Sequence, residues 1–296
     1  MKKIILYVVI FFIASLSYSF AQIPKHLKLL NEYVVPFNKV FKNTTIGGLS
    51  GIDYDSKNNS YYFISDDRSA VNAARAYKAN ITLSTKGIDT VIFTDVITFR
   101  QFDSSTYPNA KTDAAHTPDP ESIRYNALTN QLVWSSEGER IVSAKDTVLE
   151  NPAITITDIN GKAIDTFPLP VQLYMHSSKE GPRQNGVLEG LAFTSDFKTL
   201  FASVEEPLYR DGERAGLDSN QQTYCRFIQY DIASKKPIAQ YAYPLDPVAY
   251  APNPKGSFMV NGISEIMWVS KDHFIAIERS YSTGRLSCTI KLYLVD

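Results

Sequence analysis

Cysteine and histidine are scarce in this sequence, whose 296 residues include two of the former and four of the latter. Two cysteines cannot build a disulfide-dense scaffold, and no Cys-x-x-Cys or His-Glu-x-x-His spacing indicates a zinc site. Cys225 and Cys288 both lie in strand-like runs, so we expect buried free thiols, with a disulfide between them as the alternative. The sequence also lacks a Walker-type phosphate loop and a dinucleotide fingerprint, so we expect no nucleotide cofactor.

An excess of charge of either sign is missing as well. Thirty basic residues against 31 acidic ones leave a formal net charge of −1, which excludes the broad basic field on which nucleic-acid binders rely. We therefore expect no nucleic-acid partner. What is present is an apolar fraction of 44%, enough for a globular core, and 18 tyrosines and 16 phenylalanines, a composition that favours strands.

Residues 1–21 have the pattern of a secretory signal peptide. A basic start at Met1–Lys3 is followed by an apolar run over Ile4–Leu16 and by small residues at Ser19–Ala21. The run is shorter than the ~20 residues of a membrane span, so a membrane anchor is the lesser alternative. We expect a secreted or periplasmic protein without a membrane span after cleavage, and mass spectrometry of the exported protein should find Gln22 at its amino terminus. Retention of Met1 in a membrane fraction would contradict this.

Internal repetition organises the rest of the chain. Each repeat opens with a strand-like run, continues through a polar turn into a second apolar run, and therefore predicts a β-hairpin. The four opening segments are Gly48–Tyr54, Pro120–Tyr125, Leu188–Phe193 and Ser264–Trp268.

Each of these hairpins ends in acidic residues. The closing acid stands 16 positions after the opening residue in the first three repeats and 13 in the fourth; the pairs are Ser50 and Asp66, Glu121 and Glu137, Glu189 and Glu205, and Glu265 and Glu278. Hairpins that recur about every 70 residues, with further strand-like runs between them, are typical of a β-propeller of four-stranded blades. A β-sandwich is the alternative.

We expect residues 22–296 to form this one all-β domain, with four repeats visible. The fourth repeat is followed by only one more strand-like run, residues 286–295. We therefore expect a chain cut short within its propeller and a ring that is incomplete at its carboxyl end, with residues 28–35 pairing with the last blade. Unpaired strand edges favour self-association.

The repeated acids predict a ring of carboxylates at one mouth of the propeller channel. The two open ends of a hairpin are neighbours, so Glu121 should lie close to Glu137, and Glu189 close to Glu205. Oxygen ligands of this kind suit Ca²⁺. The alternative is that each acid accepts backbone N–H groups of the next blade as a structural latch. The expected ligands are Asp66, Asp67, Glu121, Glu137, Glu189, Glu205, Glu265 and Glu278.

The order of these motifs resembles the phytase-like family, described by an esterase-like activity of phytase, whose members are exported β-propellers. The resemblance covers residues 47–296 and rests on Gly-Leu-Ser-Gly, Asp-Pro-Glu-Ser-Ile, Leu-Glu-Gly-Leu-Ala and Gly-Ile-Ser-Glu with their closing acids. It implies a hydrolase of phosphoesters, with phytate-like compounds as the leading substrates. A small anionic or ester substrate is then expected at the channel mouth.

In this hypothesis Ca²⁺ at the acids polarises a phosphoryl oxygen, and arginines that follow the acids pair with phosphate oxygens. The residues expected to take part in catalysis are Glu137, Glu205, Arg68, Arg140 and Arg279. Two alternatives stay open: a metal-dependent lactonase or esterase on the same architecture, and a propeller that binds a ligand or partner without catalysis.

Overall fold

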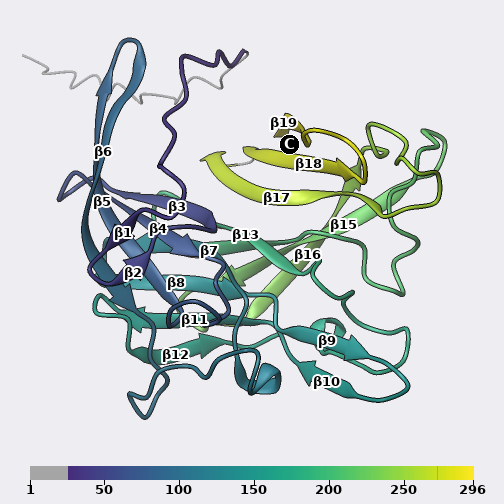
Figure 1. Ribbon diagram of the computed structural model, residues 1–296, viewed down its shortest axis with the longest axis horizontal. Coiled ribbons are helices and arrows are strands. Elements are labelled where there is room, and N and C mark those ends of the chain that lie inside the picture. The colour runs from purple at the N-terminus through teal and green to yellow at the C-terminus, as the bar shows by residue number, and fades with distance from the viewer. Residues whose placement is uncertain (1–25, 272) are drawn as a thin grey trace, which may run out of the picture.

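Strands dominate the structure. The computed structural model describes residues 26–271 and 273–296, so the expected signal peptide lies outside the described residues. The helical turns in these residues are two short 3₁₀ segments, η1 (Ala114–His116) and η2 (Val171–Leu173). None of the helices in the described part of the chain is long and apolar enough to cross a membrane. The predicted all-β class is confirmed (Figure 1).

Four antiparallel sheets form the blades of a β-propeller, which also confirms the predicted architecture (Figure 1). Within each blade the strands follow one another from the first to the last in chain order. Blade 1 comprises β3 (Leu49–Asp55), β4 (Ser60–Ser65), β5 (Arg75–Ser84) and β6 (Gly87–Thr98); blade 2 comprises β7 (Pro120–Asn126), β8 (Gln131–Ser136), β11 (Ala153–Asp158) and β12 (Ala163–Phe167). Blade 3 comprises β13 (Leu188–Phe193), β14 (Thr199–Val204), β15 (Thr223–Asp231) and β16 (Pro237–Leu245); blade 4 comprises β17 (Met259–Ser270), β18 (His273–Ser282) and β19 (Thr289–Val295).

The first strands of the blades pack against one another in chain order, β3 beside β7, β7 beside β13 and β13 beside β17. The expectation of four strands in each unit is met in blades 1 to 3 and is wrong for blade 4, whose sheet has three strands. Because the first strands lie innermost, residues at their amino-terminal ends are brought together at one end of the propeller.

Two small hairpins complete the fold, β1 (Val40–Phe41) with β2 (Thr44–Thr45), and β9 (Glu139–Val142) with β10 (Thr147–Glu150). The first packs on blade 1.

The expectation that residues 28–35 pair with the last blade is wrong. They form no strand, and Asn31 instead exchanges two hydrogen bonds of 2.8 Å with the backbone of Ile88 in β6.

The opening hairpins owe their tight turns to side chains that cap the backbone. In blade 1 the carboxylate of Asp55 accepts the N–H groups of Lys57 and Asn58. In blade 2 the amide oxygen of Asn126 accepts the N–H groups of the residues two and three positions later. Asn59 and Asn130, which precede the second strands, have positive φ values of 48° and 54°, a conformation that asparagine tolerates better than most residues.

Apolar residues of adjacent blades interlock to form the core. Between blades 1 and 2, Ile64 and Ile123 are fully buried, and the rings of Phe99 and Trp134 stack with centroids 4.6 Å apart. Equivalent clusters join blades 2 and 3 and blades 3 and 4. The first strands are thereby held rigidly, and so are the acids that they carry.

Both cysteines are free thiols. Cys225 in β15 is buried, as expected, and its Sγ donates to the backbone oxygen of Glu205. The expectation of a buried Cys288 is wrong, because this residue precedes β19 and is exposed.

Candidate functional site

Each first strand contains a register shift at the same place. The pairing with the second strand shifts between Leu49 and Gly51, Pro120 and Ile123, Leu188 and Gly190, and Ile263 and Glu265. An extra residue in a strand re-aims its side chain, and such bulges are frequent beside active sites. The register therefore makes Ser50, Glu121, Glu189 and Ser264 structural equivalents.

The closing positions are aligned by the same pairing. Leu49, Pro120, Leu188 and Ile263 pair with Ser65, Ser136, Val204 and Glu278. The next residue in each repeat is therefore the equivalent closing residue, which is Asp66, Glu137, Glu205 and Arg279. Blade 4 thus presents a serine and an arginine where blades 2 and 3 each present two acids. The predicted alignment of the fourth repeat, which used Glu265 and Glu278, is therefore wrong by one position.

Glu265 and Glu278 both have other partners in the interior of the protein. The carboxylate of Glu278 accepts hydrogen bonds from the Tyr243 hydroxyl at 2.8 Å and from the Asn261 amide at 2.6 Å. Glu265 forms an ion pair with the buried Arg124 at 2.7 Å. Each side chain joins structural elements, and neither belongs to the carboxylate groups that follow.

Five buried carboxylates, which we call the acid cluster, meet where β7 and β13 begin. They are Asp119, Glu121, Glu137, Glu189 and Glu205. Their oxygen atoms form two groups in which all three lie within 4.8 Å of one another, Asp119 with Glu121 and Glu137, and Glu137 with Glu189 and Glu205. The predicted proximity of Glu121 to Glu137, and of Glu189 to Glu205, is confirmed.

Glu137 occupies the centre of the acid cluster and is 1% exposed. Its Oε1 accepts the backbone N–H of Val187, just before β13, at 2.5 Å. Its Oε2 is buried and has no hydrogen-bond partner. Glu137 Oε1 is therefore bonded to the next blade, as expected for a structural latch. Glu137 Oε2 has no partner in the protein and remains available to a ligand.

Burial governs the protonation of the acid cluster. It raises the pKa of Asp119 to about 7, although Arg68 opposes the shift, and that of Glu205 to about 7 against the effect of Arg279. Burial, with the nearby Asp119 carboxylate, raises the pKa of Glu121 to about 8. Burial and then neighbouring carboxylates raise the pKa values of Glu137 and Glu189 well above the usual range. Without a cation, the cluster retains protons near neutral pH.

Two arginines lie beside different members of the acid cluster. Arg279 Nη2 lies 3.3 Å from Glu205 Oε1, and its side chain is 47% exposed. Arg68 forms an ion pair with Glu139, and its Nε lies 3.8 Å from Asp119 Oδ2. Of the two, Arg279 has the more accessible guanidinium group.

Arg140 is not brought to the acid cluster. Its guanidinium donates to the backbone oxygens of His176, Ser177 and Ser178 at 2.9 to 3.2 Å and lies over the Tyr209 ring. These bonds anchor the loop over residues 176–178.

The two aspartates of blade 1 have different environments. Asp67 accepts the N–H groups of Ala70, Val71 and Asn72 and a hydrogen bond from Arg75, so it holds the loop before β5. Asp66 lies at the rim of the cluster, where burial and then its neighbour Asp67 raise its pKa.

Sequence reasoning missed Asp119, Glu139 and Glu150. Asp119 immediately precedes β7, and the Asp-Pro-Glu run offered a signal, an acid two positions before Glu121. Glu150, from β10, has a buried oxygen without a partner, and burial raises its pKa to about 8 against the effect of Arg68. No sequence pattern links that hairpin to the repeat.

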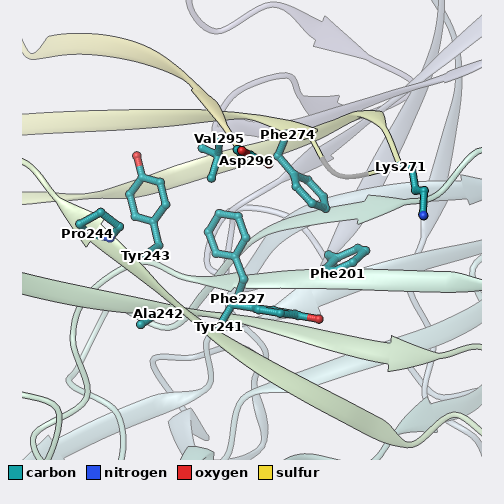
Figure 2. Close-up of a pocket in the computed structure, with 10 residues that line it drawn as sticks. All are labelled: Phe201, Phe227, Tyr241, Ala242, Tyr243, Pro244, Lys271, Phe274, Val295 and Asp296. Carbon is teal, nitrogen blue, oxygen red and sulfur yellow. The ribbon is translucent and has the colours of Figure 1, made fainter. Parts of the chain in front are cut away.

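A pocket of about 310 Å³ lies between blades 3 and 4 (Figure 2). Phe201, Phe227, Tyr243 and Phe274 supply most of its aromatic lining, with Lys271 at one side. No member of the acid cluster lines it. The pocket has little of the chemistry that a hydrolytic reaction requires, so the acid cluster is the candidate site.

Comparisons with known proteins identify a family. A family model described as "Phytase-like: Esterase-like activity of phytase" matches residues 44–296. None of the curated proteins compared with the chain matches it.

Three solved structures are similar to the chain at low sequence identity. The periplasmic gluconolactonase PpgL of Pseudomonas aeruginosa is 10% identical, with a TM-score of 0.37; the match covers 84% of this chain and 72% of that one. A putative 6-phosphogluconolactonase from Bacteroides uniformis is 9% identical, with a TM-score of 0.35 and coverage of 86% and 87%. The RRP9 WD40 repeats are 10% identical, with a TM-score of 0.36; the match covers 82% of this chain and half of that chain's length, 50%.

Proposed function

We propose that this chain, which belongs to the phytase-like family, is a hydrolase-type propeller that cleaves phosphoesters at the acid cluster with a divalent cation, Ca²⁺ being the expected ion. Membership of a family described by an esterase-like activity supports hydrolysis. The observation that carries the proposal is the buried, unpartnered Oε2 of Glu137, surrounded by four more carboxylates. Phytate-like compounds are the expected substrates, and the N-terminal pattern supports action outside the cytoplasm.

The donor set fits a hard divalent cation. All the available ligand atoms are carboxylate oxygens, and the three oxygens of each group lie within 4.8 Å of one another. A Ca²⁺ ion with bonds of about 2.3 to 2.6 Å fits between oxygens at such spacings. When bound, such an ion polarises a phosphoryl or carbonyl oxygen and lowers the pKa of water.

The chain's own residues set the geometry. The Val187 N–H fixes one oxygen of Glu137, and the Ser50 hydroxyl donates to Glu121 Oε2 at 2.5 Å. Arg279, half exposed beside Glu205, is placed to pair with a phosphoryl oxygen. In the reaction a water oxygen adds to phosphorus, the ester P–O bond breaks, and the leaving oxygen takes a proton, yielding an alcohol and inorganic phosphate.

Ester or lactone hydrolysis is the second candidate. The family description names an esterase-like activity, and the same carboxylates and cation would serve a carbonyl carbon as well as a phosphorus atom. The two candidate functions differ in their need for Arg279, because an uncharged ester gains little from a guanidinium group.

A substrate panel tests the proposal. Purified protein is assayed on phytate, p-nitrophenyl phosphate, an aryl acetate and a γ-lactone, with Ca²⁺ or with EGTA. We expect phosphate release that requires Ca²⁺. Turnover of the acetate or lactone alone would favour the second candidate, and no turnover of any substrate would favour a binding propeller.

Substitution of Arg279 should affect phosphoesters selectively. In Arg279→Gln the KM for the phosphoester should rise about tenfold, because a charge-assisted hydrogen bond to phosphate is lost. The KM for an aryl acetate should stay close to that of the wild type. Arg226→Gln, which removes an arginine paired with Asp211 on the outer part of blade 3, is the matched control. An equal rise in KM for both substrates would contradict the assignment.

A further inference from the structure

Blade 4 has an outer edge that differs from those of the other blades. Blades 1 to 3 each end in a fourth strand, whereas the sheet of blade 4 ends at β19, and no strand in the part of the chain that the structure describes pairs with the outer edge of β19 (Figure 1). Backbone N–H and C=O groups along such an edge can pair with a strand of another chain. We infer that two copies of this chain join at this edge, with β19 antiparallel to β19 of the second copy.

The outer edges of the other three blades are protected against strand pairing. β16 contains Pro237 and Pro244, β12 has only five residues, and β6 pairs with β5 through two register shifts. Prolines, short strands and bulges all keep sheet edges from pairing with other chains. β19 has seven residues without a proline, and its pairing with β18 contains no register shift. Of the four outer edges, β19 is therefore the one most open to an added strand.

One face of β19 is apolar and half exposed. Val295 packs in the core between blades 3 and 4, so the residues that alternate with it lie on the face that points away from blade 3. Their exposed fractions are 48 to 52%, and they are Ile290, Leu292 and Leu294. On this face Leu292 pairs with Ile277 and Leu294 with Ile275 of β18. Apolar rows thus cross blade 4 and stop at its edge, where an added strand would continue them and remove these side chains from water.

The sequence of β19 matches a second copy of itself. In an antiparallel pair centred on Leu292, this residue lies opposite its own copy, and Ile290 lies opposite Leu294 of the second copy. Apolar side chains then face one another across the junction, a pairing that stabilises antiparallel strands. On the other face of the sheet Lys291 lies opposite Tyr293 of the second copy. A pair centred on Lys291 would instead place two lysines opposite each other, which is destabilising.

The charge at this edge is compatible with a second copy. Lys291 is the one charged residue of β19. Its ammonium group forms an ion pair with the carboxylate of Asp246, which also accepts a hydrogen bond from the Tyr293 hydroxyl. Each copy therefore brings a neutralised edge to the junction. Pairing of identical strands about a two-fold axis is closed, so the expected assembly is a dimer.

Oligomeric state tests this inference without an activity assay. Light scattering of the purified protein should give twice the mass of one chain, with dissociation on dilution. In Leu292→Lys two like charges would lie opposite each other at the centre of the junction, so we expect a folded monomer at concentrations at which the wild type is dimeric. Ile238→Lys makes the same kind of change at a position of β16 that is 57% exposed. This variant is the matched control and should remain dimeric.

Cysteine cross-linking tests the register of the pair. The exposed Cys288 is first replaced by serine, so that the introduced thiol is the accessible one. Directly opposite residues have Cβ atoms about 4.5 to 5.5 Å apart, so mild oxidation of Leu292→Cys should give a disulfide-linked dimer. Ile290→Cys alone should stay unlinked, and it should become linked when it is mixed with Leu294→Cys.

A wild-type protein that is monomeric at all concentrations would overturn the inference and leave this edge to a strand of another protein. A folded Leu292→Lys protein that stays dimeric would also overturn it, because the contact would then lie on another surface. If Leu292→Lys fails to fold, the cysteine variants decide, since they keep side chains of moderate size and no charge. Oxidation that leaves Leu292→Cys unlinked would then reject the proposed pairing.

Discussion

Glu137→Gln should lower the kcat/KM for phosphoester hydrolysis by roughly 10²- to 10³-fold, the scale on which loss of one preorganised charge-stabilising group acts. The amide oxygen of glutamine can still accept the Val187 N–H, so the latch between blades 2 and 3 is retained. What disappears is the negative charge at the one residue common to both carboxylate groups. Initial rates on p-nitrophenyl phosphate at saturating Ca²⁺, with circular dichroism to confirm folding, measure the effect.

The control for this experiment is a buried glutamate of the same propeller. Glu278 accepts hydrogen bonds from Tyr243, Asn261 and the backbone of Asp246, all outside the acid cluster. In Glu278→Gln the kcat/KM should stay within about twofold of the wild type once the folded fraction is taken into account. Full activity in a folded Glu137→Gln protein would show that the acid cluster takes no part in the reaction.

The stability of the cation-free protein should fall as the pH rises from about 5 to about 8. Asp119 and Glu205 have pKa values near 7 and Glu121 near 8 in the folded state, whereas unfolded carboxyl groups titrate near 4. The folded state therefore binds more protons than the unfolded state across this window, and stability declines with pH. The contribution is fully present below about pH 4 and is lost as the pH passes through the folded pKa values.

Calcium should reverse this decline. An ion that binds only the folded state at one hundred times its dissociation constant adds about 2.7 kcal/mol per site, which raises the Tm of a domain of this size by several degrees. Thermal melts with EGTA and with Ca²⁺ at pH 5, 6.5 and 8 measure both effects. A Tm that is independent of pH and of EGTA would show that the acids act only as latches.

A variant that lacks one carboxylate separates charge repulsion from other causes of the pH-dependent stability. Glu189→Gln removes one of the mutually repelling carboxylates, since Glu205, Glu121 and Glu137 all raise the pKa of Glu189. Without cations at pH 8 it should therefore melt at a higher temperature than the wild type, and its pH slope should be smaller.

The sequence by itself determined the local units of the fold. Alternating apolar residues and Asp- or Asn-capped turns specify a hairpin within some 16 residues, and the hairpin brings its own ends together. For that reason the proximity of Glu121 to Glu137 and of Glu189 to Glu205 followed from spacing alone, as did the all-β class and the propeller of repeated blades.

Contacts between blades were decided only by the tertiary structure. The register of the bulge in β17 places Ser264 and Arg279 at the positions that the spacing had assigned to Glu265 and Glu278. A one-residue change of register turns a side chain to the other face of a sheet, and no local pattern reveals a bulge. The spacing therefore predicted an acid where the fold presents an arginine.

Long-range packing accounts for the remaining differences. Asp119 joins the acid cluster, and Arg140 leaves it for the carbonyl groups of residues 176–178. Both outcomes depend on loops whose positions follow from burial against another blade and not from the residues beside them in the chain. Burial in turn raises the pKa values, because removal of water penalises the charged form of each carboxyl group. Spacing could predict which acids are neighbours, whereas their desolvation required the packed blades around them.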